Sequence, residues 1–65
     1  MLLEAAEGND KLAQFNVGRM FEKGDGVEKN ISEALRWYKA AQKQGVQEAT
    51  RKIEELQKLV YQNRI

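Results

Sequence analysis

Two neighbouring stretches decide the fold of this 65-residue chain: AQFNVGRMFEKGDGV over residues 13–27 and EALRWYKAA over residues 33–41. The apolar residues of the first stretch recur at helical spacing: Ala13, Val17, Met20 and Phe21. Gly24 and Gly26 then predict a tight loop, because glycine is the usual residue just past the last helical turn. The second stretch repeats the helical spacing. The two together therefore predict a helix, a short loop and a second helix.

The same patterns in the rest of the sequence predict one domain over residues 1–65 with helices at 2–7, 10–23, 30–44 and 46–63. Asn9 or Asp10 caps the second helix, and Asn30, followed three residues later by Glu33, resembles a capping box. Gly45 closes the third helix. The fourth carries Glu48–Lys52 as a predicted i,i+4 ion pair. No segment alternates with a period of two, so the predicted fold class is all-α.

Composition excludes several classes of function. The chain has no histidine and no cysteine, which removes the usual nucleophile–base pairs and thiolate metal sites. We therefore expect no enzymatic activity, no cofactor and no metal. The net charge of +1 indicates no nucleic-acid partner, and no apolar run is long enough for a leader or a membrane span. A cytoplasmic location is the expectation.

An internal repeat is visible at an offset of 36 residues. It pairs apolar positions of two helices: Ala13 with Ala49, Val17 with Ile53, and Met20 with Leu56. A period in this range, with two helices per unit, is typical of a helical solenoid. A single helix pair cannot bury its own apolar face, so such units stack on one another.

These residues resemble the SEL-one-like repeat family. The likeness covers one repeat, about residues 12–47, and includes the two quoted stretches, Gly18 and Gly45, while residues 2–7 resemble the end of a preceding second helix. Glu54 stands where the next repeat would have glycine, which predicts that the fourth helix is a terminal cap. The resemblance implies a tetratricopeptide-like right-handed solenoid that serves as a non-catalytic adaptor or scaffold for protein–protein interaction.

Gly18 lies in mid-helix, where glycine costs about 1 kcal/mol relative to alanine. This predicts a close helix crossing, with Ala34 and Ala41 as the facing small residues. Trp37 and Tyr38 are expected to fill the space between successive units, each with a polar atom that needs a partner.

Several motifs suggest a specific function, but an ordinary structural role explains each of them better. Gly24-Asp25-Gly26 lacks the remaining residues of either phosphate-binding loop, and turn chemistry explains its glycines. The acidic residues nearby lack the spacing of a calcium loop. Glu54 and Glu55 are expected on a solvated helix face rather than in a catalytic cleft. Trp37 and Tyr38 are expected in the core rather than in a stacking platform for bases.

We expect a protein or peptide partner to bind the first-type helices. The predicted contact residues form a stripe on the second helix and its counterpart 36 residues on: Asn16, Arg19, Lys23, Lys52, Glu55 and Leu59. Arg19 is the favoured anchor, since a guanidinium pairs bidentately with a carboxylate. Surface charge alternates in sign along every helix, so charge favours no single face.

Other interpretations remain open. The apolar end of the last helix, with Leu59, Val60, Tyr61 and Ile65, is either an end cap on the third helix or a face for self-association or a partner. The chain as a whole could instead be a small inhibitor or immunity-type protein that occludes a toxin or enzyme. An excised or engineered repeat fragment without a partner is the third possibility.

Overall fold

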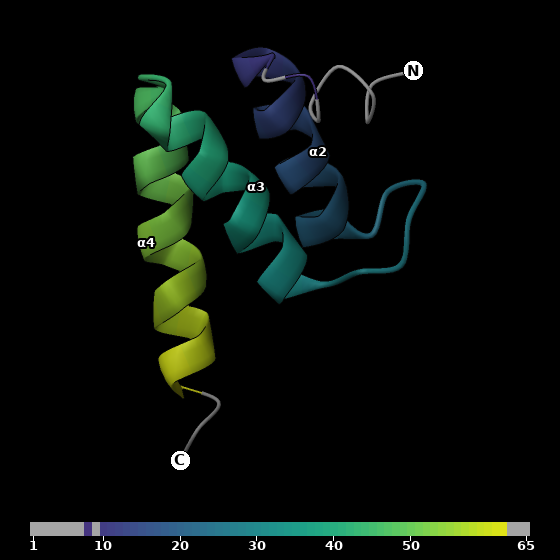
Figure 1. The fold of residues 1–65 in the computed structure, drawn as a ribbon. Coiled ribbons are helices and arrows are strands. Elements are labelled where there is room, and N and C mark those ends of the chain that lie inside the picture. The colour runs from purple at the N-terminus through teal and green to yellow at the C-terminus, as the bar shows by residue number, and fades with distance from the viewer. Residues whose placement is uncertain (1–7, 9, 63–65) are drawn as a thin grey trace.

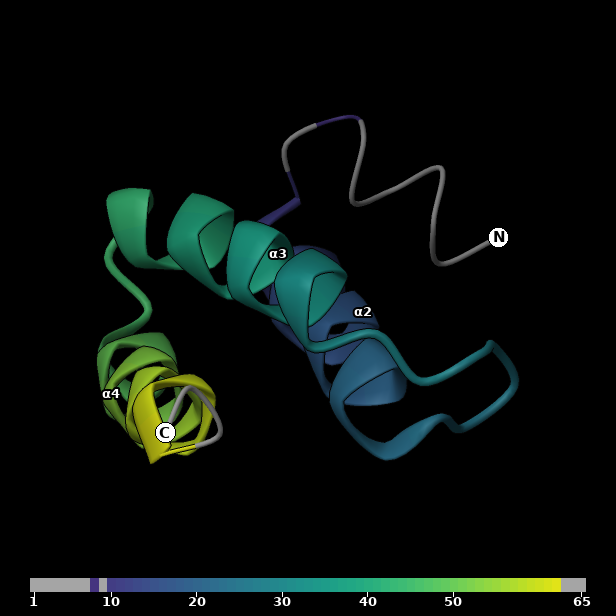
Figure 2. The same cartoon turned by 90° about the horizontal axis from the view of Figure 1, so that it is seen from below.

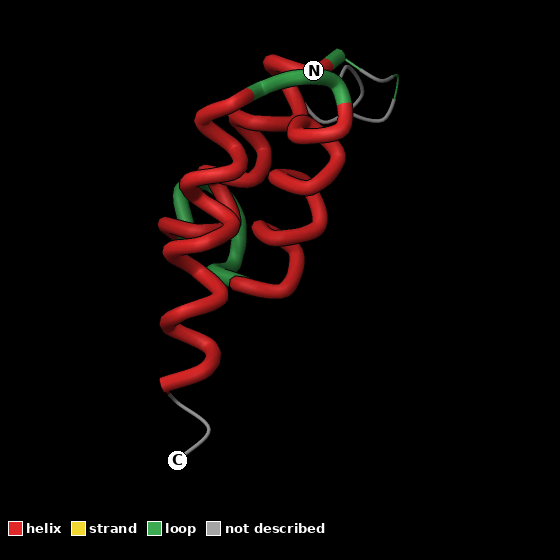
Figure 3. Tube along the Cα trace, turned by 90° about the vertical axis from the view of Figure 1, so that its left-hand side faces the viewer, coloured by secondary structure: helices red, strands yellow, loops and turns green. Residues whose placement is uncertain are grey.

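Three helices form most of the described chain. The computed structural model describes residues 8 and 10–62, with α2 at Lys11–Lys23, α3 at Ile31–Lys43 and α4 at Gln47–Gln62 (Figure 1). Helices and loops, and no strand, occur within these residues (Figure 3). The predicted all-α class is therefore confirmed. The helix expected over residues 2–7 lies outside the described residues.

Two polar side chains cap the helix starts. Asp10 Oδ1 accepts hydrogen bonds from the backbone N–H groups of Leu12, at 3.0 Å, and Ala13, at 3.1 Å. Asn30 Oδ1 accepts one from the backbone N–H of Glu33 at 3.1 Å. Each cap satisfies donors that a helix start leaves without an intrahelical partner. As a result, α2 and α3 each begin one residue after the cap.

Glycines with positive φ end the first two helices. Gly24 (φ 69°) donates its backbone N–H to the carbonyl of Met20, in the left-handed conformation that ends many helices. At the end of α3, Gly45 (φ 95°) donates to Gln42 O at 2.9 Å, and Val46 donates to Ala41 O at 3.2 Å. These two bonds define a Schellman motif. The turn into α4 is thus fixed by local backbone hydrogen bonds.

The helices are arranged with α2 and α4 on the same side of α3. Seen from below, α3 lies in one layer, and α2 and α4 lie in the other (Figure 2). The chain descends in α2, returns in α3 and descends again in α4 (Figure 1). Consequently α2 and α4 run in the same direction and together form one face of the molecule.

The core consists of two clusters that share α3. The larger joins α3 to α4: Ala34, Tyr38, Ala41, Ala49, Ile53 and Leu56. The smaller joins α2 to α3 through Ala13, Val17 and Trp37. Burial follows the 36-residue repeat at two of its three pairs, whereas Met20 is half-buried and its counterpart Leu56 is fully buried.

Gly18 does mark a close helix crossing, but its opposing side chain is not an alanine. A Cβ at this position would lie 2.8 Å from Tyr38 Cδ1 and 2.9 Å from Tyr38 Cε1. The expectation that Ala34 and Ala41 face the glycine is therefore wrong in this respect. Gly18 leaves room for an aromatic ring, and the alanines lie one turn to either side of that ring on α3.

Among the described residues, Trp37 packs within the repeat, against α2. Its ring contacts the cluster of Ala13 and Val17 on α2, and the guanidinium of Arg36 lies 5.3 Å from the ring centroid. The indole is 8% exposed, and its Nε1 has no hydrogen-bond partner in the part of the chain that the structure describes. The expected polar partner of Trp37 is thus not found there.

Candidate functional site

A side-chain link joins all three helices beneath the face formed by α2 and α4. The hydroxyl of Tyr38, on α3, donates a hydrogen bond to Glu22 Oε1, on α2, at 2.6 Å. Lys52 Nζ, on α4, lies 3.8 Å from the same carboxylate oxygen. Tyr38 is fully buried, whereas the side chains of Lys52 and Glu22 are 29% and 19% exposed. We call this arrangement the three-helix link.

The environment of the link keeps the Tyr38 phenol protonated. Burial, and then the hydrogen bond and negative charge of Glu22, raise the pKa of Tyr38 well above its ordinary value of 10.0. Arg19 acts in the opposite direction and Glu55 adds to the increase. Tyr38 therefore remains a hydrogen-bond donor to Glu22 throughout the neutral range, and charged residues of both α2 and α4 act on its hydroxyl.

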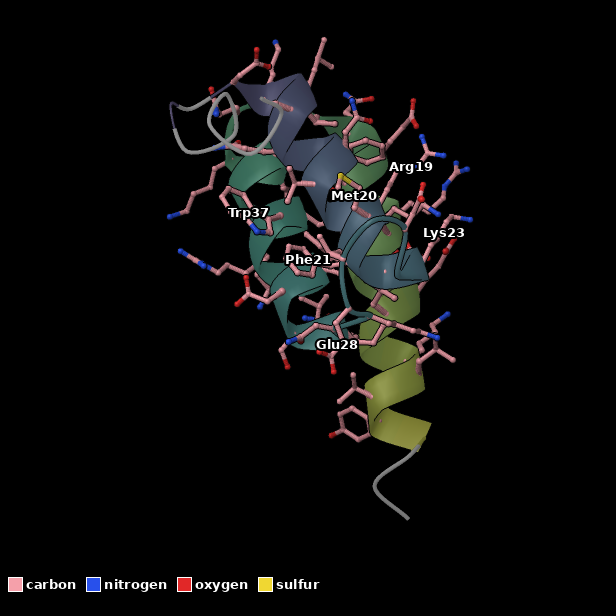
Figure 4. The ribbon with its side chains drawn as sticks, turned by 90° about the vertical axis from the view of Figure 1, so that its right-hand side faces the viewer. Arg19, Met20, Phe21, Lys23, Glu28 and Trp37 are labelled. Atoms are coloured by element: carbon pink, nitrogen blue, oxygen red, sulfur yellow. The ribbon has the colours of Figure 1, made fainter. Side chains whose placement is uncertain are left out.

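The predicted residues of α2 are brought together on its surface. Asn16, Arg19 and Lys23 are exposed and line one open concavity of about 240 Å³, together with Met20 and Asp25. Figure 4 shows Arg19 and Lys23 on the same side of α2, away from Trp37. Neither cation forms an ion pair with another described residue. Both are therefore available to an external carboxylate.

Two of the predicted residues of α4 also share a concavity. Lys52 and Glu55 line an open hollow of about 520 Å³ with Gln47, Glu48 and Arg51. Leu59, which is 52% exposed, belongs to neither hollow. We refer to the six predicted residues, with Glu22, as the α2–α4 face: Asn16, Arg19, Glu22, Lys23, Lys52, Glu55 and Leu59.

Sequence reasoning missed the part that Glu22 plays at this face. Lys52 approaches Glu22 of another helix, and the expected Glu48–Lys52 pair is not present among the ion pairs of the described residues. Glu22 and Lys52 are 30 residues apart, so no local spacing relates them. The one signal in the sequence was the need of a buried Tyr38 hydroxyl for a partner on an adjacent helix.

The described residues contain neither a metal-binding group of side chains nor a membrane-spanning helix. Within residues 8 and 10–62, no group of three or more acidic, histidine or cysteine side chains converges in a way that could hold a metal ion. Among the helices of the same residues, none is long and apolar enough to cross a membrane.

The capped pair α2–α3, with α4 packed on α3 and running in the same direction as α2, defines a helical-repeat protein of the tetratricopeptide-like class. The family model of the Sel1 repeat matches residues 11–46, more than half of the chain and the span of α2, α3 and the Gly45 turn. The chain therefore belongs to the Sel1 repeat family, as the sequence resemblance predicted. Sel1 repeats generally mediate protein–protein interaction and are typically non-catalytic. No curated protein and no solved structure gives a significant match.

Proposed function

We propose that this chain is an adaptor or scaffold module that binds a protein or peptide partner through the α2–α4 face. One observation carries the proposal: Arg19 and Lys23 are exposed, lack an ion pair among the described residues, and lie with Asn16 around a single concavity. The general role of Sel1 repeats in protein–protein interaction supports it.

The partner contributes a carboxylate to Arg19. A guanidinium presents its donors in a planar fork that matches a carboxylate, and anchor residues of this type dominate many interfaces. Lys52 has a different role from Arg19, because Glu22 already holds its ammonium group. We assign Lys52 to the support of the face, and Asn16 and Lys23 to direct contact with the partner.

The proposed module performs no catalysis and acts in the cytoplasm. The chain contains no histidine or cysteine, which removes the side chains most often used as bases and nucleophiles near neutral pH. The absence of cysteine is compatible with a reducing compartment. Localisation of the tagged protein by fluorescence microscopy would test the proposed cytoplasmic location.

The test is affinity capture from an extract of the source organism, with captured proteins identified by mass spectrometry. The wild type is compared with Arg19→Gln/Lys23→Gln and with a control that removes the same charge at exposed positions outside both hollows, Lys29→Gln/Lys58→Gln. We expect one dominant protein to be retained by the wild type and the control and lost from the first variant. Circular dichroism should show equal helix content in all three.

The identity of the captured protein also distinguishes the adaptor role from the alternative functions. Retention of an enzyme or toxin whose activity falls on binding would replace the adaptor role with that of an inhibitor or immunity-type protein. Specific retention of nothing would contradict the proposal and favour a repeat fragment without a partner.

Self-association is the second candidate function, supported by the end of α4. Leu59, Val60 and Tyr61 are 52%, 43% and 76% exposed, although the preceding turns of α4 pack on α3 through Ile53 and Leu56. Three consecutive helix positions point in different directions, so these side chains form an apolar tip at the end of α4 rather than one flat patch. An exposed apolar tip of this kind is a candidate contact surface. Sedimentation velocity at increasing concentration should show a dimer that Leu59→Gln/Tyr61→Gln abolishes. A monomer at all concentrations would exclude it.

A further inference from the structure

The positive charge of the described chain resides on α3. Residues 10–25, which hold α2 and its flanks, contain three acidic and three basic residues, and α4 also contains three of each. By contrast, α3 contains one acidic residue, Glu33, and three basic ones. The near-neutral net charge of the whole sequence conceals this difference. The expectation that charge alternates in sign along every helix is wrong for α3.

The three cations of α3 form a ridge on its outward side. Arg36, Lys39 and Lys43 are spaced three and four residues apart and are all exposed, with Ser32 one turn before them. On a regular helix these four positions fall within about 60° of one another and span about 16 Å along the axis. No acidic residue shares this sector. We call these four residues the α3 ridge.

Arg36 is held in place before any partner arrives. Its guanidinium lies 5.3 Å from the centroid of the Trp37 ring and 3.5 Å from Glu33 Oε2, yet its side chain remains 70% exposed. Because contacts with Trp37 and Glu33 already restrict its side chain, Arg36 loses less conformational freedom on binding an anion. Lys39 and Lys43 form no ion pair with the described residues.

We propose that the α3 ridge binds an acidic helical segment of a partner protein, with carboxylates three and four residues apart facing the three cations. The two helices would be complementary in charge and matched in spacing, because both would present charged residues with the same period. A protein segment fits this ridge better than a nucleic acid does. The ridge has only three cations and no exposed aromatic side chain on which a base could stack.

This surface is separate from the α2–α4 face. The ridge lies on the side of α3 opposite to Tyr38, whose ring points toward Gly18 and whose hydroxyl contacts Glu22. A single small module therefore has two differently charged surfaces. It could hold an acidic segment on α3 while α2 and α4 contact another protein, which extends the adaptor role from one binding face to two.

The test uses a fluorescein-labelled, alanine-rich helical peptide of about 20 residues that carries glutamates three and four apart. Binding is measured by fluorescence anisotropy in about 20 mM and about 200 mM salt. We expect Lys39→Gln/Lys43→Gln to weaken binding about three- to tenfold, since each exposed ion pair contributes modestly. Arg51→Gln/Lys58→Gln, which removes equal charge from α4, should change the affinity less than twofold. Arg19→Gln should also bind normally.

Several results would overturn the proposal. Equal weakening by both double variants would show a non-specific charge effect, and equal binding of the same peptide with glutamine for glutamate would show that the carboxylates are irrelevant. Absence of binding at low salt would refute it directly. A single-stranded oligonucleotide that binds the ridge more tightly than the peptide would identify nucleic acid as its ligand instead. Loss of binding in Arg19→Gln alone would place the peptide on the α2–α4 face.

Discussion

Replacing Gly18 with alanine should destabilise the protein, although alanine is the better helix former. The new Cβ would lie 2.8 Å from Tyr38 Cδ1, whereas carbon atoms in contact normally stay about 3.5–4.0 Å apart. The ring has nowhere to move, because Tyr38 is fully buried and its hydroxyl is bound to Glu22 at 2.6 Å. Overpacking of this kind costs about 2–3 kcal/mol, and the gain in helix propensity returns about 1 kcal/mol.

The expected net effect is a loss of about 1–2 kcal/mol, a large part of the stability of so small a domain. Thermal unfolding followed by circular dichroism should show a melting temperature lower by about 5–15 °C. Asn16→Ala, at an exposed position of the same helix, serves as the control and should leave the melting temperature unchanged or slightly higher. A melting temperature that rises in Gly18→Ala would refute the close contact between Gly18 and Tyr38.

Three further predictions concern single side chains. Tyr38→Phe removes the hydrogen bond to Glu22 and should cost about 1.5–2 kcal/mol in urea unfolding at pH 7. Because folding raises the pKa of Tyr38, the wild type should lose stability as pH rises above about 10, where the unfolded phenol ionises and the folded one does not. Tyr38→Phe should lack that part of the alkaline loss. Gly24→Ala should cost about 1–2 kcal/mol, since φ is 69° and the new Cβ would lie 3.1 Å from Lys29 Cβ. Asn30→Ala should cost about 1 kcal/mol through loss of the cap of α3, measured in the same way.

For each of these three predictions, a specific result would contradict it. An identical alkaline profile in the wild type and Tyr38→Phe would show that the phenol is not the responsible group. An unchanged midpoint in Gly24→Ala would contradict the left-handed helix end. Asn30→Asp should retain the stability that Asn30→Ala loses, and equal losses in both would argue against capping.

The local features of the fold were predictable because short-range chemistry specifies them. Asp10 and Asn30 are side chains that satisfy the free N–H groups of a helix start, and Gly24 adopts the positive φ at a helix end. The close crossing at Gly18 was also predicted. Its partner was not, because the absence of a side chain shows that something approaches closely but does not show what approaches.

The candidate site was less accessible from the sequence. The spacing rule grouped Asn16, Arg19 and Lys23 together, and the structure places them around one hollow. It could not reveal that Glu22 holds Lys52, since that contact depends on how α4 returns alongside α2. Averaging charge over the chain likewise hid the α3 ridge, because segregation of charge becomes visible only when exposed positions are assigned to helix faces.

The Schellman turn at Gly45 has a consequence for any longer array of such units. The direction in which α4 leaves α3 is set by hydrogen bonds within six residues, from Ala41 to Val46, together with the core cluster that joins α3 to α4. Every copy of this turn would rotate the following unit by the same amount. The turn between successive units would then determine the pitch and curvature of a multi-repeat array. One substitution in a single such turn would bend the whole superhelix at that point.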